Sequence, residues 1–174
     1  MNRRSLLALG AAATAFHAIA LPAAQAAAPG VGGLRFDHIS LNVRDFDGLT
    51  LWYREVLGFE VEVAWSVAAL DGKRLAYLRL ADTVLELVEA DADGAGLPAP
   101  ATFREHFART GYGHLCFAVE SVDRVLDALE AAGVPSFVEA ATYALDGTVY
   151  TRRVGFVQDP EGNVLEFAEP LREA

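Results

Sequence analysis

The chain repeats one pattern of secondary structure, and this internal repeat constrains the fold more than any other feature. The first unit begins FDHISLNVRDFDGLTLWYREVLGFEV, and the second begins YGHLCFAVESVDRVLDALEAAGVPSF. Each unit joins a short alternating strand to an amphipathic helix that stops at a glycine. His38 precedes Gly58 by nearly the same number of residues as His114 precedes Gly133, so the two units share one spacing.

The apolar periodicity predicts one helix and four strands in each unit. The helices are expected at about 47–57, capped by Asp45 or Asp47, and at about 122–132, capped by Ser121. Three strands should follow each helix, near 60–67, 74–80 and 83–89, and near 136–143, 149–158 and 163–169. This order predicts an α+β fold of two βαβββ modules, 35–90 and 112–170, joined by a linker, 91–111, with a short helix near 103–109.

The first 26 residues are typical of an export signal. Arg3 and Arg4 precede an apolar, alanine-rich run, and Ala24-Gln25-Ala26 fits a signal-peptidase site. The adjacent arginines favour the twin-arginine route, with Sec export as the alternative. A membrane anchor is the competing interpretation, but the run is short and interrupted by polar residues. We therefore expect a periplasmic or secreted protein without a stable membrane anchor.

Charge and cysteine content narrow the partners further. The net charge of −10 argues against nucleic acid as a partner. Cys116 is the single cysteine, so an intrachain disulfide is excluded. Within an apolar strand it is more often a small buried hydrophobe than a catalytic thiol.

Strand alternation places one histidine and one glutamate of each unit on the face that points away from the helices. Taken singly, such a histidine is more often a hydrogen-bonded structural residue, and such a glutamate more often lies on a solvated edge. The matched placement in both units indicates a shared partner, and two imidazoles with two carboxylates suit a divalent transition metal. The predicted ligands are His38, Glu86, His114 and Glu166.

Three further residues are left out of this predicted site. Glu89 falls on the helix side or at the end of its strand by the same alternation. His106 lies in the linker and His17 in the export signal, and both are interpreted as incidental.

The segments FDHISLNVRD, WYREVLGFE, GHLCFAVES and QDPEGNVLEFAEP resemble the vicinal oxygen chelate superfamily. That superfamily includes glyoxalase I, methylmalonyl-CoA epimerase, extradiol dioxygenases, fosfomycin thiol transferases and bleomycin-binding proteins. The resemblance covers about 35–170 and implies two modules whose mixed sheets curl into a cup around a metal, with the helices outside. Dimers are common in the family, and whether the cup closes within one chain or across a homodimer stays open.

The order His38, Glu86, His114, Glu166 resembles the ligand set of glyoxalase I. The resemblance implies a lyase or isomerase that removes a proton next to a carbonyl of a small substrate with vicinal oxygens. Zinc, nickel or cobalt would be the metal, rather than iron or manganese, and Glu166 the base, with Glu86 as the alternative. Tyr150, Arg152 and Arg153 lie on a strand that could line the cup.

Two other functions remain open at this point. One is a binding protein that sequesters a small molecule without turnover, and the other is an iron-dependent dioxygenase of the extradiol type. An exported protein would meet little glutathione, so a sugar, keto acid or aromatic metabolite is an alternative substrate, and the use of glutathione stays open.

Overall fold

The computed structural model describes residues 34–91, 93–94, 96–144 and 151–171. The predicted export signal and Tyr150 lie outside these residues. No helix in the described ranges is long and apolar enough to cross a membrane. The elements are β1 (Ile39–Val43), α1 (Phe46–Leu57), β2 (Glu60–Val67), η1 (Ala68–Leu70), β3 (Lys73–Leu80), β4 (Thr83–Glu89), α2 (Phe103–Phe107), β5 (His114–Ala118), α3 (Val122–Ala131), β6 (Ser136–Ala144), β7 (Thr151–Gln158) and β8 (Val164–Leu171).

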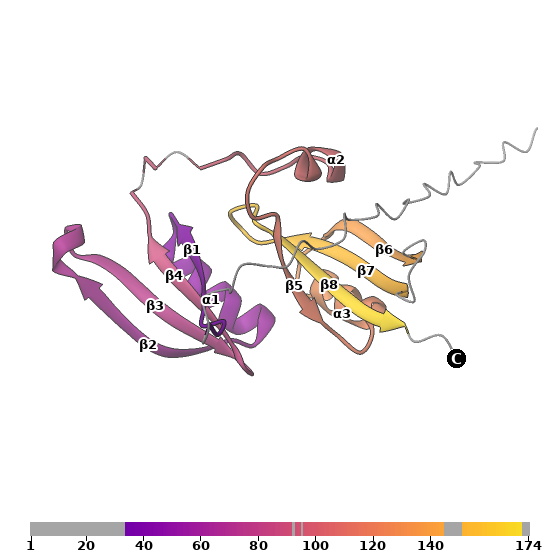
Figure 1. Ribbon diagram of the computed structural model, residues 1–174, viewed down its shortest axis with the longest axis horizontal. Helices are drawn as coiled ribbons and strands as arrows, with labels where there is room; N and C mark the ends of the chain where they lie inside the picture. The colour runs from indigo at the N-terminus through magenta and orange to yellow at the C-terminus, as the bar shows by residue number, and fades with distance from the viewer. Residues whose placement is uncertain (1–33, 92, 95, 145–150, 172–174) are drawn as a thin grey trace, which may run out of the picture.

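The described strands form two four-stranded sheets with the same topology. Their orders are β1-β4-β3-β2 and β5-β8-β7-β6. In each sheet the first and last strands of the module pair in parallel, while the other pairs are antiparallel. Figure 1 shows the sheets side by side, with β1 and β5 towards the middle and β2 and β6 at the outer ends. The predicted α+β fold of two βαβββ modules is confirmed.

Local signals fix the ends of the two long helices. The Asp45 carboxylate accepts the Gly48 N–H at 2.9 Å and caps α1. Gly58 ends α1 at φ +77°, a left-handed conformation that glycine adopts without a Cβ penalty. Ser121 caps α3, as predicted.

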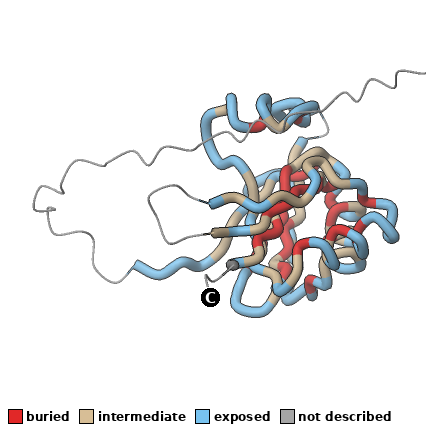
Figure 2. Tube along the Cα trace, turned by 90° about the vertical axis from the view of Figure 1, so that its right-hand side faces the viewer, coloured by how far each residue is buried: buried red, intermediate tan, exposed pale blue. Residues whose placement is uncertain are grey.

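The helix-facing side of both sheets packs into a joint core. Leu85 and Leu87 of β4 are buried with α1, and Leu165 and Phe167 of β8 are buried with α3. Figure 2 shows the buried segments running through the centre of the molecule. Four residues of α1 and β5 pack against both clusters: Trp52, Leu57, Leu115 and Phe117. The two modules therefore meet through their helix-bearing faces.

A smaller cluster covers the opposite face of the second sheet. Val154, Phe156, Val164 and Ala168 are buried there, and Phe103 of α2 packs against them. The linker helix α2 therefore lies over the face that carries Glu166. The sequence predicted this helix, but not where it would pack.

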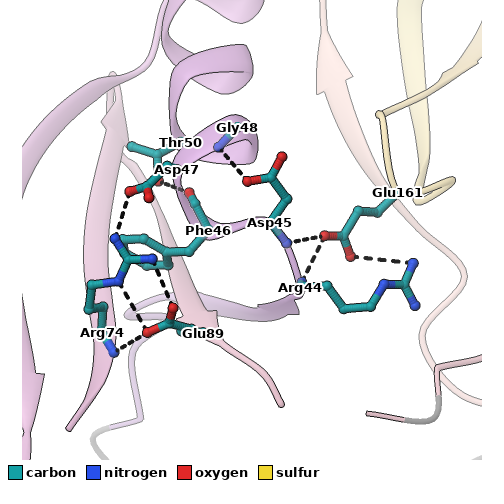
Figure 3. A network of polar contacts seen from close by, with 9 residues as sticks. All are labelled: Arg44, Asp45, Phe46, Asp47, Gly48, Thr50, Arg74, Glu89 and Glu161. Carbon is teal, nitrogen blue, oxygen red and sulfur yellow. Dashed lines mark hydrogen bonds and ion pairs between the residues drawn. The ribbon is translucent and has the colours of Figure 1, made fainter. Parts of the chain in front are cut away.

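The turn between β7 and β8 joins the second module to the start of α1. Glu161 accepts the backbone N–H groups of Arg44 and Asp45, both at 2.7 Å (Figure 3). The buried Asp159 accepts a hydrogen bond from the Tyr53 hydroxyl of α1 at 3.0 Å. Desolvation and the nearby Asp159 carboxylate raise the pKa of Tyr53 far above its usual value, so this donor keeps its proton. Residues of one turn therefore bind both the N-terminus and the middle of α1.

Replacing Glu161 with alanine should lower the free energy of unfolding by about 1–3 kcal/mol, because the backbone N–H groups of Arg44 and Asp45 lose their acceptor. Glu161→Gln should lose less, since its amide oxygen can still accept. Urea denaturation measures both variants. Glu130→Ala, at an exposed position on α3, is the control and should change stability by less than about 0.5 kcal/mol. An equal effect of the two alanine variants would contradict the role of this turn.

A second polar network also lies at the start of α1, where β3 begins and β4 ends (Figure 3). Arg74 donates to both oxygens of Glu89, at 3.1 Å and 2.8 Å, and to Asp47 at 2.7 Å. Its guanidinium also lies over the Phe46 ring, 4.7 Å from the centroid. Hydrogen bonds from Arg74 lower the pKa of Glu89 to about 2. Glu89 is thus committed to an ion pair, in agreement with its exclusion from the predicted site.

Arg74→Met should raise the pKa of Glu89 back towards its ordinary value near 4.5, because the hydrogen bonds that favour the carboxylate are lost. Since the folded-state pKa is the lower one, the pair stabilises the native protein above pH 4.5 and loses this effect as the pH falls towards 2. An NMR titration of the Glu89 carboxyl carbon measures the change. Arg79→Met, which breaks the pair with Glu62, should leave the Glu89 titration unaltered.

Candidate metal centre

The first module brings His38 and Glu86 together on one face of its sheet. Glu86 is the register partner of Ser40 in the parallel strand β1, and His38 lies two residues before Ser40. The Nε2 atom of His38 is 3.6 Å from Oε2 of Glu86, too far for a hydrogen bond. On the other side of the ring, Nδ1 lies 2.7 Å from Oδ2 of Asp37. The pair is therefore oriented with Nε2 towards the carboxylate.

Aromatic rings flank this first pair. The centroid of Tyr77 is 5.5 Å from that of His38, and Trp65 packs edge-on against Tyr77 at 4.9 Å. Tyr77 is also the register partner of Glu86. These rings form an apolar surface beside the histidine and the carboxylate.

The second module repeats the pair at an equivalent register. Glu166 is the partner of Cys116 in the parallel strand β5, and His114 again lies two residues earlier. Here Nε2 of His114 is 2.7 Å from Oε2 of Glu166, a closer contact than in the first module. The Nδ1 atom lies 3.0 Å from Nε2 of His106 in α2. In each module the histidine and the glutamate thus lie close together, and the second ring nitrogen contacts another side chain.

Within one chain the two pairs stay separate. Among the described residues, no three His, Cys, Asp or Glu side chains lie close enough together to hold one metal ion. The first strands do lie near each other, since Ile39 of β1 and four residues of β5 line one shallow pocket. The sheets do not join along these strands. Because the apolar faces meet in the joint core, the polar pairs point away from it.

The donor set of the two pairs fits a divalent transition metal. Imidazole nitrogen and carboxylate oxygen are ordinary ligands of zinc, nickel and cobalt. All four side chains keep some access to solvent, with exposed fractions of 33% for His38, 14% for Glu86, 23% for His114 and 16% for Glu166. Each histidine presents Nε2 to its glutamate, while a neighbour binds Nδ1 as metal-ligating histidines commonly require.

Cys116 lies beside Glu166 but is poorly suited to act as a nucleophile. Although the residue as a whole is exposed, desolvation of its thiol and the Glu166 carboxylate raise the pKa of Cys116 to about 11. The thiolate would therefore be scarce at neutral pH.

The arginines on β7 divide between the two faces. Arg153 forms an ion pair with Asp123 of α3 and so faces the helix side, not the proposed cup. Arg152 is exposed, and its charge acts on Cys116.

His106 was interpreted as incidental from sequence, but it contacts a predicted ligand. It is 6% exposed, and its pKa is lowered by burial first and then by the neighbouring His114. A signal was present, because Phe103, His106 and Phe107 share one helical face through their spacing of three and four residues.

Comparison with known proteins assigns the family. Residues 35–167 match the Glyoxalase/Bleomycin resistance protein/Dioxygenase superfamily, and the chain belongs to it. A lactoylglutathione lyase of Pseudomonas putida is 28% identical over 163 residues, covering 82% of this chain and 88% of that protein.

Solved structures agree with this family. A glyoxalase family protein from Enterococcus faecalis is 25% identical with a TM-score of 0.61, covering 78% of this chain and 97% of that one. The trypanothione-dependent glyoxalase I of Leishmania major is also 25% identical, with a TM-score of 0.58, and covers 79% of this chain and 87% of its own.

Proposed function

We propose that this chain is a metal-dependent isomerase or lyase of the glyoxalase I type, acting by proton abstraction next to a carbonyl. The observation that carries the proposal is the repeated histidine–glutamate pair at one register in both modules. Family membership and the similarity to a lactoylglutathione lyase support the reaction class.

His38, Glu86, His114 and Glu166 would hold the metal, which we propose to be zinc, nickel or cobalt. Once bound, such an ion supplies a Lewis acid beside the substrate oxygens. The chain itself supplies two imidazole nitrogens and two carboxylates whose net charge offsets that of a divalent ion.

Glu166 is the proposed base, with Glu86 as the alternative. Its carboxylate would take the proton from the substrate carbon and return it to the adjacent carbon, while the hydroxyl proton passes to the former carbonyl oxygen, which completes an isomerisation. Its cross-strand neighbour Phe156 is buried and apolar, so that side of the carboxylate is shielded from water.

The surroundings of the first pair favour a substrate with an apolar or aromatic group. Tyr77 and Trp65 offer ring faces and edges next to His38. We also propose that residues 1–26 direct export and are removed. Outside the cytoplasm glutathione is scarce, which favours an α-hydroxy ketone or a hemithioacetal of another thiol over a glutathione adduct.

A second copy of the chain is proposed to complete the centre. The two pairs of one chain point away from their joint core, and among the described strands β1 and β5 each end a sheet with one edge unpaired. Pairing β1 of one copy with β5 of another would bring the His38–Glu86 pair to the His114–Glu166 pair of the second copy. Two equivalent sites would form in a symmetric dimer.

His38→Ala and His114→Ala should each lower metal content and abolish turnover together, because each removes a nitrogen ligand. Glu166→Gln should keep metal, through its amide oxygen, while turnover falls by about two or more orders of magnitude because the base is gone. Metal analysis is paired with deuterium uptake next to the carbonyl of candidate α-hydroxy ketones and hemithioacetals. Glu139→Gln, at an exposed position on β6, is the matched control and should behave like the unaltered protein.

Several outcomes would overturn this assignment. Full metal binding after replacing both histidines would reject the ligand set. Unchanged exchange in Glu166→Gln would move the base to Glu86. Iron with oxygen consumption would favour ring cleavage, and tight ligand binding without metal or turnover would favour sequestration.

Complementation tests the shared centre. One variant loses the first pair, His38→Ala with Glu86→Ala, and the other loses the second pair, His114→Ala with Glu166→Ala. Each alone should be inactive, but refolding them together should restore about a quarter of the original activity, because half of the random dimers carry one intact site out of two. If each chain completed its own centre, mixing would restore nothing.

A further inference from the structure

His106 is a buried polar residue that the proposed reaction does not use. It belongs to the linker helix α2, outside the repeated pattern, and is 6% exposed. Its Nε2 atom lies 3.0 Å from Nδ1 of His114, and the same His114 ring contacts Glu166 through Nε2 at 2.7 Å. The three side chains therefore form one row of close polar contacts.

The position of α2 is fixed by contacts that do not involve the row itself. Thr102 caps the helix by accepting the Glu105 N–H at 3.2 Å. Phe103 packs on the buried Phe156 ring, with centroids 5.2 Å apart. Gln158 donates to the carbonyl of Pro100, just before the helix, at 2.8 Å. The His106 ring is thus held against His114 by the packing of the whole linker helix.

The contacts of His114 determine whether the partner of its Nδ1 atom has to donate or accept a hydrogen bond. A carboxylate can only accept a hydrogen bond, so in a singly protonated His114 ring the 2.7 Å contact with Glu166 favours a hydrogen on Nε2, and Nδ1 then accepts from His106. A metal at Nε2 would instead require the hydrogen on Nδ1, and His106 would have to accept. An imidazole can fill either role.

The first half-site has a partner of different chemistry. Asp37 holds Nδ1 of His38, and a carboxylate can only accept. This leaves Nε2 of the neutral His38 ring without a hydrogen, which agrees with the longer distance of 3.6 Å to Glu86. In singly protonated rings, these contacts favour opposite tautomers of His38 and His114.

We propose that His106 is a positioning residue for His114. It holds the ring with Nε2 towards Glu166 and keeps a hydrogen bond to Nδ1 in both tautomers, so the ring can accept a metal without turning. The importance for metal binding rests on the proposed function, whereas the effect on the ring does not.

The first test uses the metal-free full chain and imidazole ¹⁵N–¹H correlation spectra. The unaltered protein should show His114 in one Nε2–H form. His106→Ala should give mixed or exchange-broadened tautomers, and His106→Gln should restore the single form, because its amide can donate or accept at the same place. Arg104→Gln is the control, since Arg104 is an exposed residue of the same helix.

The second test measures zinc affinity against a chelating dye. His106→Ala should bind about 10–100-fold more weakly, as for the loss of other hydrogen bonds to metal ligands, and His106→Gln should recover most of this loss. The proposal is overturned if His106→Ala keeps the His114 spectrum and the affinity, or if Arg104→Gln changes them equally. If the unaltered protein binds none of zinc, nickel and cobalt, the proposed function fails, and the spectra alone decide the role of His106.

Discussion

The parallel pairing of the first and last strands in each module is the constraint on which the rest of the site depends. Leu85 and Leu87 are buried against α1, so Glu86 between them has to point to the opposite face. The register with β1 then sets His38 beside it. A slip of one residue would turn the carboxylate into an apolar core, where an unpaired charge is costly. The hydrophobic core therefore fixes the register, and the register fixes the polar pair.

The contacts between the two modules determine which way the histidine–glutamate pairs face. Asp159 is buried, but its carboxylate accepts four hydrogen bonds, one from Tyr53 and the others from Glu161 and Asn163. A buried carboxylate with this many donors is well satisfied, and it ties the turn to α1. Together with the joint apolar core, this holds the helix-bearing faces of the two modules against each other. The histidine–glutamate pairs then face outwards, which is the basis for proposing a second copy.

The repeat and the apolar periodicity were enough to predict the fold, because helix caps, glycine stops and strand alternation are local signals. Alternation also predicted that His38 and Glu86 lie on the same face of the sheet. This prediction requires only knowing which way each side chain points along its strand. The role of His106 was missed because it depends on where the linker helix packs, and spacing along the chain carries no information about that. The hold of Glu161 on the start of α1 was missed for the same reason, since its partners lie more than a hundred residues away.

A duplicated module offers two similar carboxylates, whereas in the proposed reaction one would stay a ligand while the other moves a proton. The neighbours of the two pairs differ. Glu86 lies across from Tyr77, whereas Glu166 lies across from Phe156. The second pair is further distinguished by α2, which brings the buried ring of His106 to it. Since α2 lies outside the repeated pattern, its contribution to the second pair has no counterpart in the first.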